Sequence, residues 1–77
     1  MRIIVWVKAN SKSDLLTKIG RDEYRASVRV GGSHQAITDA LLKVVASHFS
    51  VASSWVQVVA GKVGNRKVLE IIGKSSD

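Results

Sequence analysis

The residues best suited to act on a ligand are basic, and one group lies in the loop 61–67. Lys62, Arg66 and Lys67 of this loop stand between two apolar runs rich in β-branched residues, which are typical of paired strands. Gly61 provides the conformational freedom that a tight connection needs. We therefore expect a hairpin whose tip carries these three cations into water. Together with Lys8 and Lys12, they would grip a phosphate backbone without distinguishing its sequence.

A second basic group is predicted on the face of a sheet. Alternation along a strand places Trp6 with Lys8, and Arg25 with Arg29, on the side away from the apolar positions. Nucleobases stack on aromatic rings and phosphates pair with guanidinium groups, so such a face predicts binding of single-stranded nucleic acid. The predicted nucleic-acid-binding residues are Lys8, Lys12, Arg25, Arg29, Trp6, Lys62, Arg66 and Lys67.

Two alternatives stay open for the tryptophans. Exposed Ile4 and Trp6 side by side are costly, so the loop 8–19 or a second subunit would bury them if no ligand does. Trp55 is either part of the core or a second surface for stacking. If the sheet face serves a protein partner or self-association, Ile4, Trp6 and Val59 would form its apolar patch.

Catalysis and metal binding find little support. Ser33-His34 and Ser47-His48 are neighbours in sequence, but a nucleophile and its base must face each other and need a third, orienting group. The six acidic residues are scattered and no metal-ligand spacing is present. The chain has no Cys, which rules out thiolate zinc sites. We expect no enzyme, no cofactor and no metal.

Length and charge limit the possible classes of protein. A chain of 77 residues forms one small domain, expected over 1–73 with a flexible tail at 74–77. The net charge of +6 favours polyanionic partners such as RNA, although basic surfaces also keep small proteins soluble. The apolar run 3–7 is too short for a signal peptide or a membrane span. We expect a cytoplasmic protein, monomeric or weakly dimeric, with no membrane contact.

The elements that must position these side chains follow from hydrophobic periodicity. Strands are predicted over 2–7, 23–30, 55–60 and 68–72, with 15–19 as a candidate short extra strand. A helix from 34 to about 49 follows Ser33, whose hydroxyl is placed to cap it. The order ββαββ predicts an α+β fold of two layers, with one main helix packed on a four-stranded mixed sheet. The strands flanking the helix would run parallel, and two hairpins would supply antiparallel pairs.

The order of motifs resembles the YggU-like family of small uncharacterised proteins. The resemblance spans the segments 7–12, 35–42, 54–59 and 61–68, and it implies a two-layer α+β fold without implying an activity. This chain departs from the family pattern at Ala9, where Pro is usual, and at Ile37, where Asn is usual. Gly64 and Asn65 stand where the family has Ser and Arg, so a family site at these positions would be lost or rebuilt here.

The leading function is therefore that of a nucleic-acid-binding module, for RNA, with weak sequence selectivity. The alternative is a protein-interaction or self-associating subunit that uses the apolar part of the sheet face.

Overall fold

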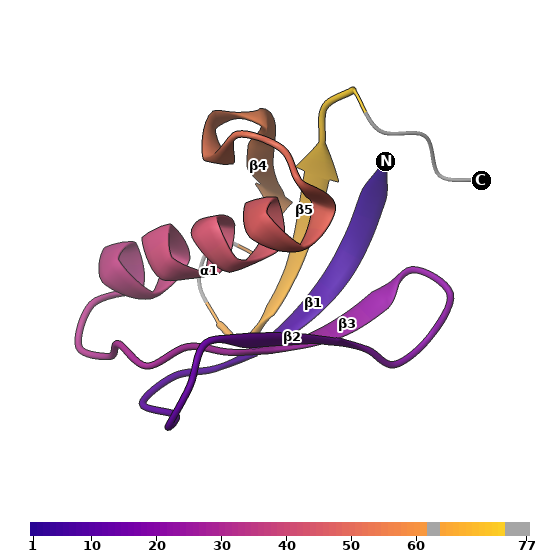
Figure 1. The fold of residues 1–77 in the computed structure, drawn as a ribbon. Coiled ribbons are helices and arrows are strands. Elements are labelled where there is room, and N and C mark those ends of the chain that lie inside the picture. The colour runs from indigo at the N-terminus through magenta and orange to yellow at the C-terminus, as the bar shows by residue number, and fades with distance from the viewer. Residues whose placement is uncertain (62–63, 74–77) are drawn as a thin grey trace.

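The computed structural model describes residues 1–61 and 64–73. Its sheet has five strands in the order β2-β3-β1-β5-β4, and α1 packs across one face (Figure 1). In chain order the elements are β1 (Arg2–Lys8), β2 (Leu15–Lys18), β3 (Glu23–Ser27), α1 (His34–Phe49), the single 3-10 turn η1 (Ser53–Trp55), β4 (Val56–Ala60) and β5 (Arg66–Ile71).

The predicted α+β class with one helix on a mixed sheet is confirmed, but four strands in the order ββαββ was wrong. The candidate segment at 15–19 is a true strand, β2, which makes the order βββαββ. β2 pairs antiparallel with β3 at the edge of the sheet. Only Leu16 of this strand is buried, so its sequence carries too little alternation to define a strand by itself.

The pairing of β1 was also predicted wrongly. β1 runs parallel to β3, with Val5 opposite Tyr24, and antiparallel to β5, with Val5 opposite Lys67. The physical reason is β2, which reverses the chain between β1 and β3 so that the first hairpin joins β2 to β3. Because β5 is antiparallel to both β1 and β4, the strands that flank the helix, β3 and β4, run parallel as predicted.

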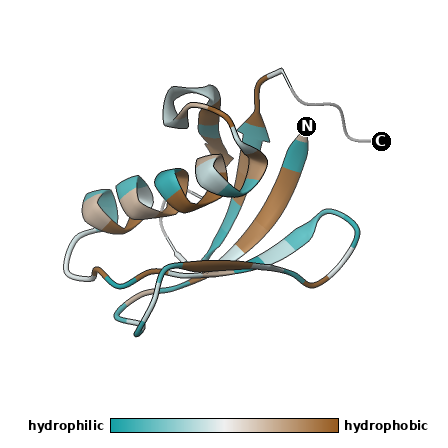
Figure 2. Ribbon diagram, in the orientation of Figure 1, coloured by the Kyte–Doolittle hydropathy of each residue, from teal (hydrophilic) through white to brown (hydrophobic). Residues whose placement is uncertain are grey.

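The core lies between α1 and the face of the sheet toward it. In Figure 2 the middle of β1 is the brown, hydrophobic centre of the sheet. Ile3 and Val5 of this strand are 1% and 0% exposed, whereas Trp6 is 41% exposed on the other face. The buried core cluster consists of Ile3, Val5, Leu16, Tyr24, Ala26, Leu41, Val45, Ala46, Val56, Leu69 and Ile71. Burial is confined to one face of β1 because successive side chains of a strand point to opposite faces of the sheet.

The helix begins and ends where its capping residues predict. The Ser33 hydroxyl accepts a hydrogen bond from the Ala36 amide at 3.1 Å, which satisfies one of the free donors of the first turn. At the other end Ser50 adopts a left-handed conformation and its amide donates to the last turn. No helix among the described residues is long and apolar enough to cross a membrane.

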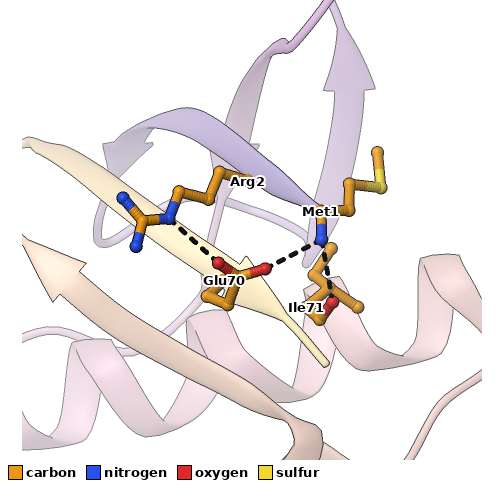
Figure 3. A network of polar contacts seen from close by, with 4 residues as sticks. All are labelled: Met1, Arg2, Glu70 and Ile71. Atoms are coloured by element: carbon orange, nitrogen blue, oxygen red, sulfur yellow. Dashed lines mark hydrogen bonds and ion pairs between the residues drawn. The ribbon is translucent and has the colours of Figure 1, made fainter. Parts of the chain in front are cut away.

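A polar contact joins the beginning of β1 to the end of β5 (Figure 3). The N-terminal ammonium donates to Glu70 Oε2 at 2.8 Å and to the Ile71 carbonyl at 3.2 Å. Arg2 Nε donates to Glu70 Oε1 at 2.9 Å. These hydrogen bonds hold the pKa of Glu70 below its ordinary value. The bond from the ammonium has the largest effect, and the bond from Arg2 has the next largest.

Candidate nucleic-acid interface

The open face of the sheet carries a row of three predicted site residues. Trp6 lies on β1, opposite Arg25 of β3 on one side and opposite Arg66 of β5 on the other. All three residues are exposed. Neighbouring strands are about 4.8 Å apart, so the backbones of the two arginines flank the tryptophan at nearly equal distances. The sheet therefore places the tryptophan between two arginines.

Two contacts hold the Trp6 ring in position. Its Nε1 donates to Glu23 Oε2 at 3.3 Å, and the Arg66 guanidinium carbon stands over the ring, 5.8 Å from its centroid. Glu23 is opposite Ile4 on β3 and therefore reaches Trp6 diagonally. A cation–π pair at an exposed site is worth about 0.5–1 kcal/mol, less than the roughly 1–3 kcal/mol of a base stacked on an aromatic ring.

Three more predicted residues gather at the end of the sheet where β1 finishes. Lys8, the last residue of β1, is exposed opposite Ser27. The following loop is held against the segment after β3, because the Ser11 amide donates to the Val28 carbonyl and the Arg29 amide donates to Asp14 Oδ1. Lys12 and Arg29 are exposed in these two adjacent segments. The structure thus places their charges in the two loops that follow β1 and β3, at the same end of the sheet as Lys8.

Lys67 does not belong to this surface, and its expected position in water was wrong. Its side chain is 2% exposed, and its ammonium donates to the Gly61 carbonyl at 3.1 Å. The cause is the start of β5 at Arg66, two residues earlier than predicted. Alternation then sends Arg66 to the open face and Lys67 to the face toward the helix. Lys62, the remaining predicted cation, lies outside the described residues.

The charges on the open face are unevenly distributed along the strands. Around Trp6 and beyond it stand Lys8, Arg25 and Arg66, whereas toward the beginning of β1 the face carries Glu23 and Glu70, and Arg2 there is paired with Glu70. The only ion pairs between described side chains or the N-terminus involve Glu70. A phosphate would accordingly be attracted to the end of β1 and not to its beginning.

Trp55 is neither part of the core nor a neighbour of Trp6. It is 50% exposed, and its carbonyl accepts a hydrogen bond from the Ile72 amide at the far end of the sheet. Register places it about six residues along the strands from Trp6, roughly 20 Å at a rise of ~3.3 Å per residue. Each tryptophan therefore belongs to a different surface region.

The neighbouring serine and histidine residues have other contacts. Ser33 caps the helix through its hydroxyl, and His34 is exposed at the first helical position. His48 meets the rings of Tyr24 and Phe49 edge-on, with centroids 5.7 and 4.9 Å away. Adjacent residues on a helix do not face each other, which separates Ser47 from His48. Within the described ranges, no group of three or more His, Asp or Glu side chains could hold a metal ion.

A hollow of about 640 Å³ lies elsewhere, between α1 and the edge strand β2. Leu16, Val30 and Val44 supply apolar walls, and Asp39 and Lys43 stand among its polar lining residues. None of the predicted site residues within the described ranges lines it. The Trp6 row is instead part of the open face of the sheet, which leaves room for a stacked base and an extended phosphate backbone.

Sequence reasoning missed two features of the candidate interface. It assigned Arg66 to a separate loop surface, since the register that sets it opposite Trp6 joins positions far apart in the chain. It also gave Glu23 no role. The available signal was that Glu23 shares the alternating face of Arg25, but its approach to Trp6 depends on the parallel pairing of β1 and β3.

Fold and surface together describe a small two-layer α+β protein with a basic, tryptophan-bearing sheet face. Neither a protein-family model nor a curated protein matches the chain. Membership in the YggU-like family stays a prediction that rests on the segments quoted above.

Proposed function

We propose that this protein is a small nucleic-acid-binding module whose ligand is RNA, bound with weak sequence selectivity at the open face of the sheet. The observation that carries the proposal is the row Arg25–Trp6–Arg66 across three adjacent strands. Guanidinium groups pair with phosphates, and an exposed indole ring between them offers a surface for a base. Lys8, Lys12 and Arg29 extend the positive charge at the same end of the face.

Weak selectivity follows from the kind of groups present. The cations of this face would contact phosphates, which are identical at every nucleotide, and stacking is available to every base. The net charge of +6 adds a long-range attraction that increases the rate of encounter with a polyanion. Affinity should consequently depend strongly on salt concentration.

The test measures the affinity of a labelled single-stranded RNA by fluorescence anisotropy over a range of salt concentrations. Arg66→Gln and Arg25→Gln should each weaken binding and lower the slope of log affinity against log salt by about 0.7, the value for one phosphate contact on a single strand. Arg21→Gln is the matched control, because it removes the same charge from the exposed turn between β2 and β3, away from the row. A loss as large in Arg21→Gln as in Arg66→Gln would contradict a localised site.

A protein-interaction function is the second candidate, favoured by the exposure of apolar side chains. Trp6 and Val59 are each 41% exposed, and Ile4 is half-buried beside Trp6 on β1. Sedimentation velocity over a range of protein concentrations separates the two functions. A stable dimer in which Trp6 fluorescence is shielded from a soluble quencher would favour self-association, whereas a monomer that binds RNA would favour the leading proposal.

A further inference from the structure

We infer that Trp6 binds a single unpaired nucleobase by stacking, and that this base takes the place over the ring that Arg66 holds in the free protein. The inference rests on the proposed function and names the part of the nucleic acid that the site recognises. It follows from three properties of the row: the Trp6 ring is held in one orientation, Arg66 lies over the ring where a base could replace it, and arginines flank the ring on both sides.

The ring is fixed before any ligand arrives. Its Nε1 donates to Glu23 Oε2 at 3.3 Å, which restrains the rotation of the indole about its side-chain bonds. Trp6 is nevertheless 41% exposed, so much of its surface remains in contact with solvent. A stacking surface held in one orientation loses little freedom when a base binds to it. Glu23 acts here as a positioning residue, since it touches the ring and not the base.

The group that lies over the ring in the free protein is the planar guanidinium of Arg66, and a base can replace it. The Arg66 guanidinium carbon is 5.8 Å from the ring centroid, near the outer limit of a cation–π contact. Stacking of a base on the ring is the stronger of the two interactions. Arg66 then becomes available to the phosphate beside that base, while Arg25 stands on the other side of the ring for the next phosphate.

This arrangement selects unpaired nucleotides. Bases inside a duplex already stack on their neighbours, and a ring that belongs to a sheet face and bonds to Glu23 cannot enter between them. Trp55 lies at the far end of the sheet, so it cannot stack an adjacent base of the same short strand. We expect a footprint of a single stacked base with its neighbouring phosphates.

The experiment compares two ligands of equal charge. One is a short oligouridylate, and the other is a chain of the same length built from abasic ribose-phosphate units. The protein should bind the oligouridylate about 5- to 150-fold more tightly, the range that stacking of one base provides. Trp6→Leu should abolish this ratio, so that the variant binds both ligands with equal affinity. Trp6→Phe, which keeps a smaller ring, should retain part of the ratio if Trp6→Leu fails to fold.

The outcomes separate the inference from the proposed function. Equal affinity for both ligands would overturn the stacked base and leave phosphate binding intact. Failure to bind either ligand at low salt would overturn the proposed function itself. Tighter binding of an RNA duplex than of oligouridylate would also contradict the selection of unpaired bases.

The role of Glu23 is tested in the same assay. Glu23→Gln keeps a carbonyl acceptor for Trp6 Nε1 and removes a negative charge, so both ligands should bind more tightly and their ratio should stay the same. Glu23→Ala releases the ring, so the ratio itself should fall. In a Trp55→Phe background, fluorescence anisotropy of Trp6 should report a more mobile ring only in the Glu23→Ala variant. An unchanged ratio in Glu23→Ala would remove Glu23 from the site.

Discussion

Lys67 combines a charged group with the environment of a core residue. It is 2% exposed on the side of β5 that also buries Leu69 and Ile71, and its ammonium bonds to the Gly61 carbonyl. The aliphatic part of a lysine side chain packs as an apolar group while its ammonium satisfies polar atoms at the margin of the core. Lys67 thereby ties the start of β5 to the end of the preceding strand.

Substitution of Lys67 should therefore destabilise the fold. Lys67→Ala removes the packed stem as well as the hydrogen bond to Gly61, and we expect a loss of about 2–4 kcal/mol in the free energy of unfolding. Lys67→Met keeps most of the volume and should cost less. Urea denaturation followed by circular dichroism measures both. Lys43→Ala, on the exposed part of α1, is the control and should stay within about 0.5 kcal/mol of the parent. Similar costs for Lys67→Ala and Lys43→Ala would show that the Lys67 stem is not packed.

At the scale of elements, the connection between β4 and β5 depends on Gly61. Its φ of +72° lies in the left-handed region, and a Cβ at this position would collide with the Arg66 carbonyl oxygen. A non-glycine residue would face both the conformational penalty and the collision. The position of Arg66 in the candidate interface thus depends on a glycine five residues earlier.

Gly61→Ala should lower stability by about 2 kcal/mol or more, from left-handed strain plus the backbone collision. Gly20→Ala is a matched control in the turn before β3: its Cβ would meet only ordinary contacts, at 3.4 Å from Glu23 Cβ, and its φ is not positive. We expect Gly20→Ala to change stability by less than about 0.5 kcal/mol. Thermal unfolding of the two variants gives the comparison. If Gly61→Ala were as stable as Gly20→Ala, the left-handed turn would not be required.

The elements predicted from sequence were those set by local rules. The helix 34–49 with its Ser33 cap, and the position of Trp6 on the side of its strand away from the apolar residues, follow from periodicity and capping within a few residues. Strand pairing is different, because it is decided by contacts between distant segments. The parallel partnership of β1 and β3 depends on a four-residue edge strand, β2, whose own signal is weak.

The same division applies to the candidate site. Alternation placed Trp6 and Arg25 on the open face correctly, since each belongs to a strand with a clear period. The start of β5 was set two residues too late, and this single error assigned Arg66 to the loop surface instead of the sheet face and placed the buried Lys67 in water. A strand boundary is not marked locally where charged residues continue an apolar run, so alternation had no fixed starting point there.

For the molecule as a whole, Glu70 links the two outermost segments of the described sequence. It accepts from the N-terminal ammonium and from Arg2, and these bonds lower its pKa. A lowered pKa means that the unfolded chain takes up the proton first as the pH falls. The stabilising contribution of Glu70 is therefore present at neutral pH and is lost as the pH falls through and below the ordinary value near 4.5.

Glu70→Gln should consequently reduce stability at neutral pH and reduce the loss of stability in acid. The measurement is the urea midpoint of parent and variant at neutral pH and at about pH 3. The two midpoints should differ at neutral pH and approach each other in acid. Asp39→Gln serves as a control, because Asp39 is an exposed helix carboxylate whose hydrogen bond comes from the neutral Gln35 side chain. A constant difference between parent and Glu70→Gln at both pH values would exclude the ionic contribution.

The central position of β1 also has a consequence for biosynthesis. A ribosome completes β1 first, but one of its two partners in the sheet is β5, and Arg2 meets Glu70 across 68 positions of the sequence. Until β5 has left the exit tunnel, the apolar side of β1 has only half of its neighbours. Contacts this distant in sequence also slow the search for the native state. The nascent chain must therefore keep the apolar side of β1 from aggregating until β5 has emerged.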